Sequence, residues 1–94
     1  MPYIDRYRRI RFEPVLEIAK AAMSDSDFTL GDLNYILTGI IHLYWERGRN
    51  YARVCNIVGT LESVKQEFYR RVAAPYEEEK CKLNGDVYIK KEYL

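Results

Sequence analysis

The segment between Thr29 and Gly48 most constrains the fold, because its apolar residues recur with the period of an α-helix. Thr29 stands three residues before Asp32, as in a capping box with Asp in place of Glu, and Gly48 is a typical C-terminal stop. The apolar residues cover about half of the helix circumference: Leu30, Leu33, Ile36, Leu37, Ile40, Ile41, Leu43 and Tyr44. The other half is not an ordinary charged surface, since it holds Gly31, Asn34, Tyr35, Thr38, Gly39, His42, Trp45 and Glu46. We therefore expect a central helix that ends at Arg47 and is covered on both sides.

Two further segments have the same period. A helix that begins near Glu13, with Pro14 in its first turn, should end at "SDSD", because Ser and Asp side chains compete for backbone hydrogen bonds. A longer helix should begin after Asn50 and carry one apolar stripe: Val54, Ile57, Val58, Leu61, Val64, Phe68 and Val72. Pro75 removes a backbone donor, so we expect a kink near residues 73–74 and an end at Asn84-Gly85.

The two ends of the chain show no helical period. Residues 1–12 are expected to form an extended arm that carries four arginines: Arg6, Arg8, Arg9 and Arg11. Residues 86–94 are expected to form a tail, and a short strand pairing between this tail and "MPYI" is one possibility. The sequence thus predicts a single all-α domain over residues 1–94. It has three helices, of which the third is long and kinked, and short extended termini.

Composition favours association. A chain of 94 residues forms one domain that buries a modest share of its surface, yet 48% of the residues are hydrophobic and nine are tyrosines. We therefore expect a homodimer that forms a helical bundle. The formal net charge is +1, which provides no general attraction to nucleic acid or to anionic lipid.

The sequence also predicts the compartment. Cys55 and Cys81 have no CxxC spacing, so they are expected to be reduced thiols with small, buried side chains. The N-terminal segment is too charged for a signal peptide, and no apolar run reaches the ~20 residues of a membrane span. These observations predict a soluble, cytoplasmic protein without a membrane segment.

The carboxylates raise the possibility of a metal site, because small helical pyrophosphohydrolases hold magnesium between acidic residues on neighbouring helices. Glu62 and Glu67 are five residues apart, about 140° around a helix, whereas Glu67 and Glu78 lie about 16 Å apart along it. Glu77, Glu78 and Glu79 are consecutive and point in three directions. We therefore expect no catalytic residues, no metal and no cofactor, with a small hydrolase for a phosphate-containing ligand as the alternative function.

The single histidine and the arginine arm have two interpretations each. His42 could act as a general base, but a hydrogen-bonded histidine at an interface is favoured, because the sequence shows no orienting partner. The four arginines of residues 1–12 alternate with aromatic and aliphatic residues, which suits single-stranded nucleic acid. The other interpretation is that they pair with the acidic residues of "YEEEK". Nucleic-acid binding through this arm is the second alternative function.

Short polar side chains line one face of two predicted helices. On the long helix an arc of about 80° holds Asn56, Thr60, Ser63, Glu67 and Arg71. On the preceding helix the corresponding residues are Asn34, Thr38 and His42, with Trp45 beside them. An ordinary exposed face would carry Lys and Glu, so we expect these faces to approach each other or a second subunit.

The segment from Glu67 to Tyr88 resembles a binding site but is explained first as structure. Glu67 stands three and four residues before Arg70 and Arg71, the favoured orientation for helical ion pairs. Tyr76 is expected to cover the kink at Pro75. The alternative is an anion or partner site built on the two arginines.

Three segments, "GDLNYILTGII", "EFYRRVAAPYEEEK" and "NGDVY", resemble an uncharacterised family of proteins of about this length from phages and from bacterial and archaeal genomes. The resemblance spans most of the chain, from "MPYI" to "NGDVY". It implies no activity and no site residues, but it favours a small helical accessory protein. The predicted function is thus a homodimeric interaction module that can also contact a protein partner.

Overall fold

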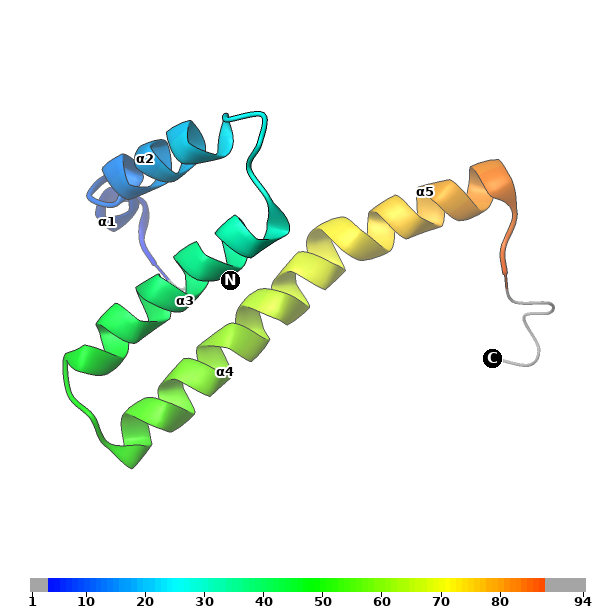
Figure 1. The fold of residues 1–94 in the computed structure, drawn as a ribbon. Helices are drawn as coiled ribbons and strands as arrows, with labels where there is room; N and C mark the ends of the chain where they lie inside the picture. Colours follow the sequence, from blue (N-terminus) through cyan, green and yellow to red (C-terminus); the bar gives the residue numbers. More distant parts are fainter. Residues whose placement is uncertain (1–3, 88–94) are drawn as a thin grey trace. The chain divides into compact units, whose positions relative to one another are not determined.

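The computed structural model describes residues 4–87, and every regular element in this range is helical (Figure 1). The elements in chain order are α1 (Arg6–Ile10), α2 (Glu13–Met23), α3 (Leu30–Glu46), α4 (Tyr51–Phe68), the π-helical segment η1 (Tyr69–Ala73) and α5 (Ala74–Asn84). The last three join without a break, so the described residues form four separate helices. The predicted all-α class is confirmed, as is the long C-terminal helix.

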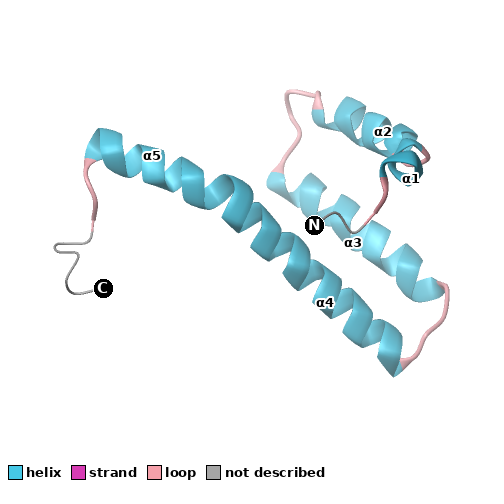
Figure 2. Ribbon diagram, turned by 180° about the vertical axis from the view of Figure 1, so that it is seen from behind, coloured by secondary structure: helices cyan, strands magenta, loops and turns pink. Residues whose placement is uncertain are grey.

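The chain divides into two units, Met1–Leu43 and Tyr44–Leu94. The first unit contains α1, α2 and most of α3, and the second contains the end of α3 together with α4, η1 and α5. Figure 2 shows the loops that connect these helices. The single domain stays a prediction, and the proposed strand pairing of the termini concerns residues 1–3 and 88–94, which lie outside the described residues.

Residues 6–10 correct the predicted extended arm, because they form helix α1. The Asp5 carboxylate accepts a hydrogen bond from the backbone N–H of Tyr7 at 2.8 Å and caps the helix. Arg8 and Arg9 lie in its last turn, where cations complement the negative end of the helix dipole. A helix of five residues makes little more than one turn, so an apolar period has no room to appear in the sequence.

Helices α2 and α3 begin as predicted. Pro14 lies in the first turn of α2, and Ser24 ends that helix by donating its hydroxyl to the carbonyl of Ala21 at 2.7 Å. At α3 the capping box is present: Thr29 N–H donates to Asp32 Oδ2 at 2.8 Å, and Asp32 N–H donates to Thr29 Oγ1 at 3.2 Å. Local hydrogen bonds between neighbouring residues therefore determine where these helices start and stop.

The long helix contains a wide turn where the sequence predicts a kink. In η1 the N–H of Ala74 donates to the carbonyl of Tyr69, five residues earlier. In an α-helix the ring of Pro75 would clash with the carbonyl of Arg71, four residues earlier. A π-turn widens the backbone at this point, so the helix continues through Pro75 to Asn84 instead of breaking near residues 73–74. Gly85 then ends it at a φ of +84°, as the Asn-Gly pair predicts.

Arg53 ties the start of α4 to the preceding turn, all within the second unit. Its Nη1 donates to the carbonyl of Tyr44 at 3.2 Å, and its guanidinium lies 4.6 Å from the centre of the Tyr44 ring. Gly48 leaves room for it, because a Cβ at that position would lie 3.2 Å from Nη2 of Arg53. The cationic side chain thus adds a second hydrogen bond to a carbonyl that also accepts the N–H of Arg47 at 3.2 Å.

No side chain is buried anywhere in residues 4–87. Within one chain the helix over residues 30–46, which is expected to be covered on both sides, is not covered, since Leu30 and Tyr35 are each 80% exposed, and its cover by a second subunit stays a prediction. The physical reason is the number of helices: about half of the circumference of α3 is apolar, and one short chain has few other faces to set against it. In the described range no helix is both long and apolar enough to cross a membrane.

Asn50 provides a test of helix initiation. Its side chain accepts a hydrogen bond from the N–H of Arg53 at 2.8 Å, so Asn50→Ala should lower the free energy of unfolding by about 1 kcal/mol. Asn50→Asp, which keeps a side-chain oxygen at the cap, is the matched control and should leave stability nearly unchanged. Urea denaturation followed by circular dichroism measures both. Equal losses from the two variants would contradict a capping role.

Candidate functional site

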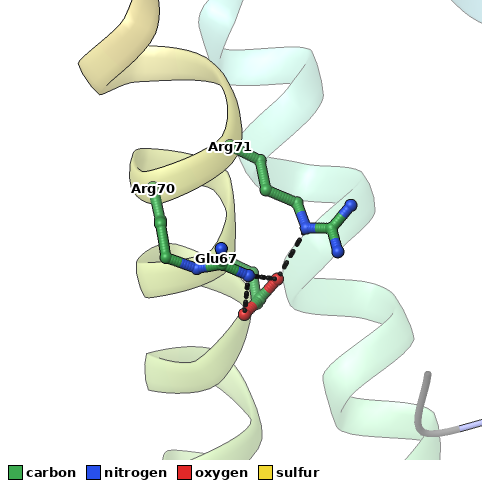
Figure 3. A network of polar contacts seen from close by, with 3 residues as sticks. All are labelled: Glu67, Arg70 and Arg71. Carbon is green, nitrogen blue, oxygen red and sulfur yellow. Dashed lines mark hydrogen bonds and ion pairs between the residues drawn. The ribbon is translucent and has the colours of Figure 1, made fainter. Parts of the chain in front are cut away.

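One carboxylate and two guanidinium groups meet at the end of α4. Glu67 lies in the last turn of α4, and Arg70 and Arg71 follow in η1. Nη2 of Arg70 donates to both carboxylate oxygens of Glu67, at 3.0 and 3.1 Å, and Nε of Arg71 donates to Oε2 at 3.1 Å. Figure 3 shows the two guanidinium groups reaching the carboxylate from different sides. The predicted pairing of Glu67 with both arginines is therefore present.

The local sequence explains this geometry. Residues three and four positions apart lie on neighbouring turns, and a glutamate that precedes its cationic partners follows the direction of the helix dipole. Glu67 satisfies both spacings at once, so one carboxylate serves two arginines. The cluster of Glu67, Arg70 and Arg71 keeps one positive charge in excess.

The arginines lower the pKa of Glu67. The largest cause is the hydrogen bond from Arg70, followed by partial desolvation, which acts in the opposite direction, and then by the positive charges of Arg70 and Arg71. The Glu67 side chain is 49% exposed, and both arginine side chains are more exposed than that. Water and salt therefore screen these ion pairs, and their contribution to stability is small.

Tyr76, which the sequence places in the same cluster, has a different neighbour. The ammonium group of Lys80 lies 5.5 Å from the centre of the Tyr76 ring, one turn further along α5. This contact follows the i, i+4 spacing of a helix and involves a partly exposed ring. A role for Tyr76 beside Arg70 and Arg71 stays a prediction.

The two polar faces proposed as an interface lie in different parts of the chain. On α3 the hydroxyl of Thr38 donates to Oδ1 of Asn34 at 3.3 Å, so these two side chains contact each other. Trp45 is half-buried, and Asn56, Thr60 and Ser63 are exposed on α4. The prediction that these faces meet each other or a second subunit, with His42 among them, stays a prediction.

The N-terminal arginines are arranged by α1. Arg9 uses its Nε to donate to the carbonyl of Ile4 at 3.2 Å, and the guanidinium of Arg11 lies 5.9 Å from the centre of the Phe12 ring. Arg6 and Arg8 are exposed on the same short helix. Their pairing with "YEEEK" and their use in nucleic-acid binding both stay predictions.

An open depression beside the cluster holds two carboxylates that are already paired. It is lined by Glu62, Lys65, Gln66, Glu67, Tyr69 and Arg70. The pKa of Glu62 is lowered, chiefly by the hydrogen bond that Gln66 donates at 3.0 Å and then by the charge of Lys65. A catalytic acid or base near neutral pH needs a raised carboxyl pKa, so both shifts run against that role. Among residues 4–87 no group of three potential metal ligands lies together.

The cysteines differ from the prediction in one respect. Cys55 and Cys81 are free thiols, as expected, but both are exposed and not buried. A helix face is buried only where another element covers it, and spacing within one helix does not reveal that. Neither thiol belongs to the cluster around Glu67.

Two features were not predicted from the sequence. The π-turn could not be predicted, because a proline within a helix indicates a kink and a π-turn equally well. The contact of Arg53 with Tyr44 spans nine residues across a turn, so no helical spacing indicates it. Gly48, which makes room for that arginine, was visible in the sequence only as a helix stop.

The fold and the site define a small all-helical protein with exposed apolar helix faces and a surface ion-pair cluster. A family model described as a domain of unknown function, DUF6899, matches residues 1–87. The chain belongs to this family, which agrees with the predicted resemblance to an uncharacterised family. Nothing among curated proteins or solved structures matches it. The function of the family is unknown, and the predicted phage origin stays a prediction.

The relative effects of Arg70 and Arg71 on the pKa of Glu67 can be measured. Because Arg70 donates two hydrogen bonds and Arg71 one, Arg70→Gln should raise the pKa of Glu67 more than Arg71→Gln does. The contribution of Glu67 to stability is present above its unfolded pKa, about 4.3, and is lost as the pH falls through the lower folded value. An NMR titration of the Glu67 carboxyl carbon measures all three proteins. A larger rise of the Glu67 pKa in Arg71→Gln than in Arg70→Gln would contradict this prediction.

A double-mutant cycle tests whether Arg71 is structural or binds an anion. Arg71→Ala and Glu67→Gln should each lower the melting temperature slightly, and the double variant should lose less than the sum, because the two side chains interact. Phosphate should leave all four melting temperatures unchanged. The anion-site alternative gives the reverse pattern: Arg71→Ala slightly stabilises the free protein by relieving repulsion with Arg70, and protection by phosphate disappears.

Proposed function

We propose that this chain is a small helical interaction module that works as a homodimer. A single observation carries the proposal: no side chain in residues 4–87 is buried, although every helix bears large apolar residues. A folded chain without a core has little hydrophobic stabilisation, because that stabilisation grows with the apolar area removed from water. A second copy of the same chain would bring apolar helix faces that can cover those of the first.

Large apolar side chains are exposed on each of the longer helices, among them Leu16 at 68%, Leu43 at 71% and Val58 at 60%. Obligate homodimers bury about 2,000–5,000 Å² in total, and their interfaces are rich in apolar side chains. Exposed faces of this kind therefore support a dimer interface.

An accessory role fits the site better than catalysis does. The carboxylates around Glu67 have lowered pKa values and are exposed to water, and the cluster lies on a helix surface instead of in an enclosed pocket. Enzyme sites are concave and mostly apolar, with a few converging polar groups. The resemblance to short phage- and prokaryote-encoded proteins supports an accessory module as well.

Light scattering coupled to size exclusion tests the dimer. We expect a mass twice the 11.2 kDa of one chain at micromolar concentration. The melting temperature should rise with protein concentration, because association stabilises only the folded chains.

A single-chain mass together with a cooperative, concentration-independent melt would contradict the proposal. That result would mean that one chain is stable without a second copy. Measuring both quantities on the same sample separates this outcome from an unfolded monomer, which gives no cooperative melt.

A further inference from the structure

The apolar residues of α4 form a narrow seam along one side of the helix. Positions 54, 58, 61, 65, 68 and 72 follow one another at alternating intervals of four and three residues, which is the spacing of a two-helix seam. All but Lys65 are apolar, and the apolar members are between 40% and 60% exposed. The seam spans about 27 Å, or five turns.

The other helices are less suited to pairing with the same helix of a second copy. Helix α2 has only 11 residues, and the apolar residues of α3 cover about half of its circumference, which is typical of a helix surrounded by several others. The α4 stripe, with Ile57 and Val64 at its edge, covers about 120°. It ends at Val72 within η1, because Tyr76 and Leu83 are the only large apolar residues of α5.

We propose that α4 pairs with α4 of a second copy in antiparallel orientation, with the two-fold axis near Ser63. This rests on the proposed homodimer and names its surface. In this register Val54 lies opposite Val72 of the second copy, Val58 opposite Phe68, and Leu61 opposite Lys65. Each layer then joins two different seam positions, as antiparallel helices require.

Charge decides between the two orientations. In the antiparallel register Lys65 lies beside Glu62 of the second copy, and its methylene stem covers Leu61. Arg47 and Arg49, just before α4, come near Glu77 and Glu79 of the second copy. A parallel pair would set Lys65 against Lys65 and three consecutive glutamates of α5 against their own copies, which costs free energy through like-charge repulsion.

Thiol cross-linking tests the orientation. In a background of Cys55→Ser and Cys81→Ser, one chain carries Val54→Cys and another carries Val72→Cys. A mixture of the two, treated with a short bis-maleimide, should give covalent dimers with one chain of each kind, identified by mass spectrometry. Each chain alone should give few, because two copies of position 54 lie about 27 Å apart in this register. Ser63→Cys, on the opposite face of α4, is the matched control and should not cross-link.

Three outcomes would overturn the inference, and light scattering on the same samples separates them. Efficient cross-linking of Val54→Cys with itself means a parallel pair. A mass of two chains without any cross-linking in the mixture means that another surface forms the dimer, and the proposed function survives. A single-chain mass for the unmodified protein removes both the homodimer and its proposed surface.

Discussion

The apolar faces of the helices need a cover, and this need governs the rest of the structure. In residues 4–87 no side chain is buried, so the ends of the helices rest on local interactions, and the proposed dimer would supply the missing cover. Propensity and capping alone leave short helices marginal in water, because most helical stability in proteins comes from packing an apolar face. The exposed apolar stripes of α2, α3 and α4 therefore support the proposed dimer.

Local hydrogen bonds set the boundaries of the helices. Backbone donors that a helix start leaves free are satisfied by Asp5 at α1, by Thr29 and Asp32 at α3 and by Asn50 at α4. At the other end of the chain, Gly85 ends α5 with a positive φ. The π-turn at η1 has the same local character. It lets the helix pass Pro75 without a break, and it coincides with the end of the apolar seam and with the cluster around Glu67. The π-helical segment therefore lies where the apolar seam of the long helix ends and its polar part begins.

The cluster of Glu67, Arg70 and Arg71 is a group of ion pairs that is exposed to water. The hydrogen bonds from Arg70 and Arg71 hold the Glu67 carboxylate in its charged form, and water screens the pairs because the side chains are exposed. An active site instead needs groups whose pKa values are shifted toward their task and shielded from solvent. We propose that the cluster belongs to the polar rim of an interface.

The sequence by itself determined the helices beyond residue 12, the caps at Thr29 and Asn50 and the Glu67 ion pairs, because these depend on residues within four positions of one another. Only the structure decided the features that depend on longer distances or on burial. The contact of Arg53 with Tyr44 crosses a turn, and the exposure of Cys55 and of α3 depends on which faces are covered. Helix α1 escaped prediction because five residues are too few for a period, and the π-turn because a proline motif indicates disruption without specifying its form. Periodicity reveals which face of a helix is apolar, whereas tertiary structure decides what covers it.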